Sequence, residues 1–181
     1  MRIGRLAFAA WLAGGLAAWG AEPQNYGFSY NYTRNGLKVE ITAGEGESFS
    51  NGTYVITVTP ADAAVQRIVG QRDGVIRKAW VSDLNGDDEQ EIVVFTMSAT
   101  NGRGAVAVYE KAGKAEYSRR QMADLPEDLK KVFRGHDQFE VKNRVLLRIF
   151  ALFNEGDPDS HPTGGVVRLR YAYAENVWVR E

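Results

Sequence analysis

The chain has 181 residues, of which 44% are hydrophobic and 25% are charged, and these values are ordinary for a globular protein with a sizeable core. The formal net charge of −1 argues against a nucleic-acid-binding protein, because such proteins need a basic surface to displace counterions from phosphates. The absence of cysteine excludes disulfides, thiolate zinc sites, a cysteine nucleophile and a lipid-modified N-terminal cysteine, and only two histidines are present to act as a catalytic base.

The first twenty residues have the pattern of an export signal. Arg2 and Arg5 make a short basic start, and residues 6–19 form an apolar run that is too short to span a bilayer comfortably. Ala18 and Gly20 are small residues two apart, as signal peptidase requires. We expect residues 1–20 to be a cleaved signal peptide, and residues 21–181 to be a single domain that is soluble in the periplasm and not attached to a membrane. An uncleaved membrane anchor is the alternative.

The rest of the chain is patterned as short strands separated by turn residues. Residues 37–42 alternate between apolar and polar side chains, and Asn51-Gly52 is a strong hairpin signal. Residues 92–98 are apolar on both faces, which predicts a central strand covered on both sides. We expect strands over residues 37–42, 53–59, 75–82, 92–98, 105–109, 145–153, 167–173 and 177–180.

One helix is predicted among these strands. Pro126 suits a first helical position, Leu129, Val132 and Phe133 form one apolar stripe, and Gly135 lies where a left-handed cap is needed. A helix of about nine residues is too short to be stable alone and must dock on a sheet. The whole pattern predicts an all-β fold, a single sandwich or barrel-like domain of mostly antiparallel strands with one short helix.

The acidic segment from Asp83 to Glu91 is one candidate site. Oxygen side chains at Asp83, Asn85 and Asp87 match the opening of a calcium loop. The bidentate acid of such a loop would fall on Val94, inside an apolar strand, and the glycine comes one position early. We therefore favour a tight polar turn in which Asp and Asn side chains bond local backbone, with no bound cofactor or metal. A calcium site at Asp83, Asn85 and Asp87 is the weaker alternative.

Catalytic chemistry has little support in the sequence. His136 and Asp137 are adjacent, but no serine or cysteine nucleophile is recognisable beside them, and we favour a histidine that packs at the helix end. His161 lies in a polar loop far along the chain, which argues against a zinc site. We expect a protein that is not an enzyme. A glycosidase with paired carboxylates is an alternative that spacing leaves open.

The segment from Ser98 to Gly104 is the second candidate site. It joins the two strongly apolar strands at residues 92–98 and 105–109, and it is longer than a tight hairpin needs. Its glycines allow close approach to another surface, and Arg103 carries donors that pair bidentately with carboxylates. A solvated surface loop is the alternative interpretation.

Several motifs occur in an order that resembles the periplasmic inhibitors of invertebrate-type lysozyme. The resemblance extends over about residues 75–180, and the N-terminal third matches in general character only. The motifs are the turn at residues 83–87, the apolar strand that leads into Ser98-Ala99, Gly-His-Asp-Gln-Phe at 135–139, Glu-Gly-Asp at 155–157, Pro-Thr-Gly-Gly at 162–165, and a closing strand with Leu169, Tyr171 and Trp178.

This resemblance implies a β-sandwich-like periplasmic domain that binds lysozyme, blocks its active-site cleft with a projecting loop and needs no catalytic residue. A homodimer is one assembly that it suggests. In that family the loop after the central strand carries a serine, glycines and a tyrosine and enters the active site. The corresponding residues here are Ser98, Asn101, Gly102, Arg103 and Gly104, and the tyrosine is absent. The alternative function is a calcium-stabilised binding or adhesion module of the cell envelope without inhibitory activity.

Overall fold

The computed structural model describes residues 27–111, 113 and 116–181. The predicted signal peptide, residues 1–20, lies outside these residues. The described part of the chain contains twelve strands, all paired antiparallel, and one short helix, α1 (Glu127–Lys130). Within these residues, no helix has both the length and the apolar character that are needed to cross a membrane.

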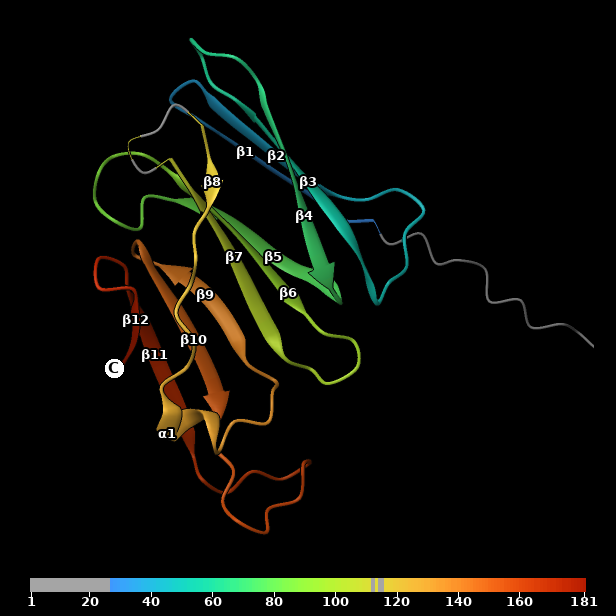
Figure 1. Cartoon of the computed structure of the whole chain (residues 1–181), viewed down its shortest axis with the longest axis vertical. Coiled ribbons are helices and arrows are strands. Elements are labelled where there is room, and N and C mark those ends of the chain that lie inside the picture. Colours follow the sequence, from blue (N-terminus) through green and yellow to red (C-terminus); the bar gives the residue numbers. More distant parts are fainter. Residues whose placement is uncertain (1–26, 112, 114–115) are drawn as a thin grey trace, which may run out of the picture.

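The strands form three four-stranded sheets, each of which follows the chain in a simple meander (Figure 1). The N-terminal sheet consists of β1 (Ser29–Arg34), β2 (Leu37–Ala43), β3 (Asn51–Thr59) and β4 (Gln66–Asp73). The middle sheet consists of β5 (Val75–Ser82), β6 (Glu91–Met97), β7 (Gly104–Glu110) and β8 (Ser118–Arg119). The C-terminal sheet consists of β9 (Gln138–Lys142), β10 (Val145–Ala151), β11 (Val166–Ala172) and β12 (Val177–Arg180).

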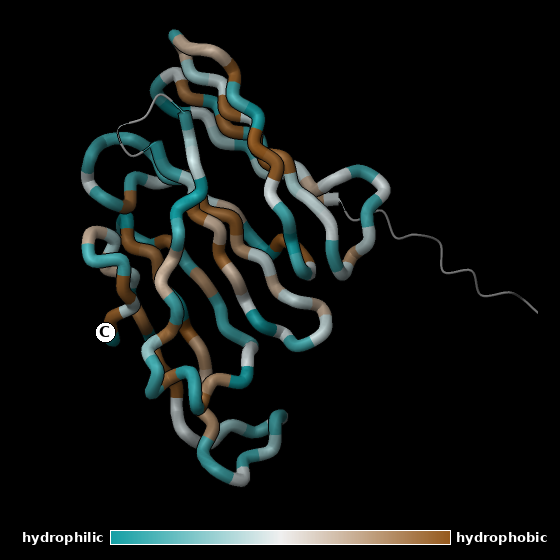
Figure 2. Tube along the Cα trace, in the orientation of Figure 1, coloured by the Kyte–Doolittle hydropathy of each residue, from teal (hydrophilic) through white to brown (hydrophobic). Residues whose placement is uncertain are grey.

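The middle sheet is covered on both faces, and β6 shows this most clearly. Ile92 and Val94 point to one side and join a buried core with the N-terminal sheet. Val93 and Phe95 point to the other side and join a second core with α1 and the C-terminal sheet. Figure 2 shows the hydrophobic stretches along strands of all three sheets. The prediction of an all-β antiparallel fold with a doubly covered central strand is therefore confirmed, and the fold has three layers.

The helix is shorter than predicted. The N–H groups of Leu129 and Lys130 both bond to the carbonyl of Pro126, but the helix ends after one turn. The carbonyl of Val132 accepts a hydrogen bond of 3.3 Å from the N–H of Phe153 and so bonds outside the helix. The expected nine-residue helix is therefore wrong. Packing of the apolar side chains between the sheets overrides the weak local tendency to continue the helix.

Candidate functional site

The β6–β7 loop, residues Ser98 to Gly104, lies at one end of the middle sheet (Figure 1). Its own hydrogen bonds define its shape. The N–H of Ser98 donates to the carbonyl of Arg103 at 2.9 Å, and the N–H of Gly102 donates to the carbonyl of Ser98 at 3.1 Å. The N–H of Arg103 also donates to Oδ1 of Asn101 at 3.0 Å. The free protein therefore holds this loop in a defined conformation.

The five predicted site residues share this loop, but they differ in exposure. Asn101 and Arg103 are exposed, and Gly102 and Gly104 are half-buried. Ser98 is only 7% exposed, and its hydroxyl lies 3.0 Å from that of Thr100. The residues that a partner can reach are therefore those at the tip, while Ser98 belongs to the base of the loop.

A second segment, far along the chain, braces this loop. We call Gly135–Asp137 the bracing segment. The N–H of His136 donates to the carbonyl of Gly102 at 2.7 Å, and Oδ1 of Asp137 accepts the N–H of Gly104 at 2.6 Å. A Cβ on Gly135 would come within 2.8 Å of the carbonyl oxygen of Asn101, so only glycine permits this close approach. The expected position of His136 at the helix end is wrong, because α1 ends at Lys130 and the imidazole lies against Gly102 of the loop.

The bracing segment is itself tied to the core by an ion pair. Oδ2 of Asp137 lies 2.8 Å from Nε and 2.7 Å from Nη2 of Arg148, whose side chain is 12% exposed, while that of Asp137 is fully buried. The guanidinium carbon of Arg148 is 5.0 Å from the centre of the Phe133 ring and 5.2 Å from that of Phe139. Burial lowers the pKa of Arg148, and the neighbouring carboxylate of Asp137 opposes this effect. This anchored pair makes the base of the loop rigid.

Arg103 is the cation at the tip of the loop. Its guanidinium carbon lies 5.4 Å from the centre of the Phe133 ring, and its charge is close enough to contribute to the lowered pKa of Arg148. Among the residues that the structure describes, Arg103 makes no ion pair. The loop also borders a hollow of about 320 Å³ whose lining includes Thr96 and Arg119. An exposed, unneutralised guanidinium beside a hollow is suited to receive a carboxylate-bearing partner.

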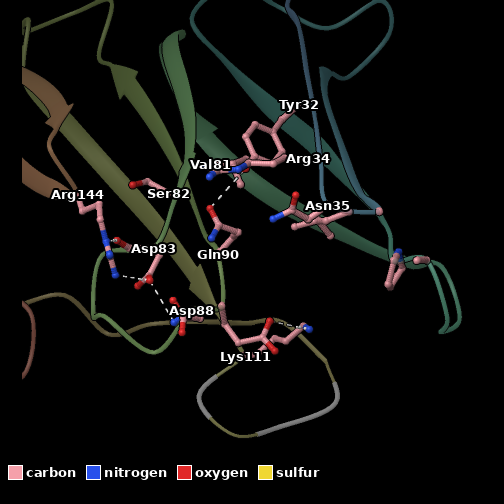
Figure 3. Close-up of a pocket in the computed structure, with 15 residues that line it drawn as sticks. Tyr32, Arg34, Asn35, Val81, Ser82, Asp83, Asp88, Gln90, Lys111 and Arg144 are labelled. Atoms are coloured by element: carbon pink, nitrogen blue, oxygen red, sulfur yellow. Dashed lines mark hydrogen bonds and ion pairs between the residues drawn. The ribbon is translucent and has the colours of Figure 1, made fainter.

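The acidic turn, residues 83–91, lies at the opposite end of β6 (Figure 1), and Asp83 and Asp88 are drawn in Figure 3. Oδ1 of Asp83 accepts the N–H of Gly86 at 2.7 Å, and Oδ2 accepts that of Asp88 at 3.1 Å and pairs with Arg144. Oδ1 of Asn85 accepts the N–H of Asp87 at 2.9 Å. These are the local backbone bonds that the turn interpretation predicts. Across the described ranges, no three His, Asp or Glu side chains are placed to hold a metal ion, and the calcium alternative gains no support.

Sequence reasoning missed the role of Glu91 in this turn, because an acid at the start of an apolar strand gives no signal of burial. Glu91 is 1% exposed, and its Oε2 accepts the N–H of Leu84 at 2.6 Å. The pKa of Glu91 is raised to about 7, and burial is the largest cause. The hydrogen bond from Leu84 opposes this rise, and the negative charges of Asp87, Asp83 and Glu110 add to it. The buried carboxyl group of Glu91 therefore stabilises the turn by accepting the N–H of Leu84.

A hollow with a volume of about 660 Å³ lies between the β1–β2 hairpin and the acidic turn (Figure 3). Two of its three basic side chains are paired with acids of the same hollow, and Arg34 makes no ion pair with a described residue. Arg144 pairs with Asp83, and Nζ of Lys111 lies 2.9 Å from Glu89. The β6–β7 loop, whose exposed arginine lies on a backbone braced by His136 and Asp137, is the candidate that we favour for binding a partner.

A known protein family matches part of this chain. Residues 33–113 match the family of periplasmic lysozyme inhibitors of I-type lysozyme, PliI. The match confirms the resemblance seen in the sequence, but its extent differs. It includes most of the N-terminal sheet, the acidic turn, β6, the β6–β7 loop and β7, whereas the motifs at residues 135–139 and 162–165 lie beyond it.

Two solved structures are similar to this chain over about half its length. The PliI of Aeromonas hydrophila is 27% identical with a TM-score of 0.45, and the alignment covers 51% of this chain and 85% of that one. The same inhibitor in complex with the lysozyme of Meretrix lusoria is 28% identical with a TM-score of 0.44, and the coverages are 51% and 82%. No curated protein matches this chain.

Proposed function

We propose that this chain is a periplasmic inhibitor of I-type lysozyme that acts by binding and not by catalysis. The match of residues 33–113 to the PliI family carries the proposal. The export pattern of residues 1–20 supports the location, and the position of the β6–β7 loop inside the matched segment supports the site. The inhibitor needs no catalytic group of its own, because occupying the cleft of lysozyme is enough to exclude its substrate.

The chemistry of the target explains why an arginine is suited to the tip of the loop. Lysozyme cleaves peptidoglycan with two carboxyl groups that face a cleft. Arg103 presents a guanidinium that is not neutralised within the described part of the chain, and Asn101 presents an amide beside it. A carboxylate in the cleft would pair with Arg103, so the charge would stay paired after it is buried. The exposed tip, residues 99–103, would then enter the cleft while Ser98 remains at the base.

The rigidity of the loop is the second reason for this proposal. Binding costs free energy when flexible segments become ordered, and a loop that already has its bound shape avoids most of that cost. Hydrogen bonds within the loop and from His136 and Asp137 fix the backbone on both sides of Arg103. The loop should therefore bind with little rearrangement.

The replacement Arg103→Ala tests this proposal, and Arg67→Ala, on the outer face of β4, is the matched control. We expect Arg103→Ala to weaken binding to I-type lysozyme by about 2 kcal/mol, or roughly thirty-fold, in isothermal titration calorimetry. Arg67→Ala should bind like the wild type. Both variants should melt within about 3 °C of the wild type, because both side chains are exposed. Equal affinity of all three proteins would exclude Arg103 as the contact residue.

A further inference from the structure

The bracing segment does more than support the loop, because it also places an exposed imidazole next to the tip. His136 is exposed, whereas Asp137, which follows it, is fully buried. The imidazole lies against Gly102, so closely that a Cβ on that glycine would come within 2.8 Å of Cε1 of His136. Asn101, Arg103 and His136 therefore share one surface, although residues 101 and 136 are far apart in the sequence.

The backbone of His136 is held in an uncommon conformation. Its φ is +59°, and Gly135 before it has a φ of +99°, so two successive residues are left-handed. The hydrogen bond from the His136 N–H to Gly102 and the burial of Asp137 fix this conformation from both sides. Residues held in this way are often found at binding sites, where the conformation directs a side chain. Here it directs an imidazole whose nitrogens make no hydrogen bond to the described residues.

We propose that His136 is a specificity-determining residue of the lysozyme-binding surface. This inference rests on the proposed function. While the tip of the loop enters the cleft, the imidazole would contact a polar group on the cleft rim, as donor or acceptor. His136 lies beyond residues 33–113, in the Gly-His-Asp-Gln-Phe motif at 135–139 that also resembles the family. The loop would contact the catalytic carboxylates, which the reaction requires, whereas His136 would contact rim residues, which the reaction does not fix.

The chain contains only two histidines, which makes a direct test simple. The imidazole Cε1–H signals of the exported protein are recorded by NMR while unlabelled I-type lysozyme is added at constant pH. We expect the signal of His136 to shift or broaden. His161, which is exposed in the loop between β10 and β11, should keep its position and is the internal control. If lysozyme binds and the His136 signal does not move, the inference is overturned while the proposed function stands.

The variants His136→Ala and His161→Ala complete the test with two I-type lysozymes that differ at the cleft rim. We expect His136→Ala to weaken binding about ten-fold to at least one of them, and to change the ratio of the two affinities. Arg103→Ala should weaken both, and His161→Ala neither. If the amide signals of Gly102 and Gly104 show that His136→Ala disturbs the free loop, His136→Asn, which tolerates a left-handed backbone, replaces it. An unchanged affinity ratio would contradict the inference, and a wild type that binds no lysozyme would contradict the proposed function itself.

Discussion

The buried ion pair of Asp137 and Arg148 gives the sharpest test of how the loop is held. Asp137→Asn removes a negative charge from a fully buried side chain and leaves Arg148, 12% exposed, without a counterion. The same change weakens the acceptor for the Gly104 N–H. Breaking one partner of a buried pair costs about 3–5 kcal/mol. We therefore expect the free energy of unfolding in urea to fall by about 3–5 kcal/mol and the melting temperature to fall by roughly 10 °C.

The exposed pair of Asp159 and Arg134 offers a matched control. The side chain of Asp159 is 88% exposed, so Asp159→Asn should cost less than about 0.5 kcal/mol. The double variant Asp137→Asn/Arg148→Met should lose less than the sum of the two single variants, because it leaves no buried charge unpaired. A loss below about 1 kcal/mol for Asp137→Asn, or full additivity in the double variant, would refute this reasoning.

Further predictions concern the acidic turn and the processing of the chain. The pKa of Glu91 lies at about 7 in the fold, above its ordinary value of 4.5. The protonated carboxyl group of Glu91 therefore stabilises the fold fully below about pH 4.5, and this stabilisation is lost as the pH rises to about 7. Glu91→Gln should therefore gain in unfolding free energy relative to the wild type between pH 5 and 8, and a constant difference would contradict the burial effect. Asp83→Ala should lose about 2 kcal/mol equally with calcium and with a chelator, because two backbone N–H groups and Arg144 lose their acceptor; a loss only with calcium would show a bound ion. Mass spectrometry of a periplasmic extract should find a chain that starts at Ala21, and recovery of the full-length chain only from membranes would argue for an anchor.

Much of the fold could be predicted because alternating and doubly apolar segments report directly on burial. The eight expected strands are all present, and β6 is covered on both faces as its residues indicate. β1, β4, β8 and β9 were not predicted, and in β4 the residues Gly70 and Arg72 disfavour a strand. In the fold, Gly70 makes room for the ring of Tyr54, and Arg72 is buried, with a hydrogen bond of 2.7 Å to the carbonyl of Gly74. The presence of such residues in a strand can be explained only from their contacts in the folded protein.

The candidate site could be predicted in part for the same reason. The β6–β7 loop was identified from the apolar strands on both sides, and Arg103 from its charge. Its bracing by His136 and Asp137 could not be predicted, since it depends on how the C-terminal sheet packs on the middle sheet. Arg148 lies within an otherwise apolar strand, and its pairing with Asp137 is evident only in the folded protein. Local patterns therefore locate a loop, but the contacts that make it rigid come from the tertiary structure.

The measurement that tests the central claim most directly is a peptidoglycan-lysis assay in which the purified protein is titrated against I-type, chicken-type and goose-type lysozymes. We predict that lysis by the I-type enzyme falls to zero near equimolar inhibitor, that the other two enzymes are affected less, and that Arg103→Ala shifts the I-type titration to higher concentrations. Undiminished lysis by I-type enzymes at a large excess of the wild-type protein would contradict the claim that this chain is a lysozyme inhibitor.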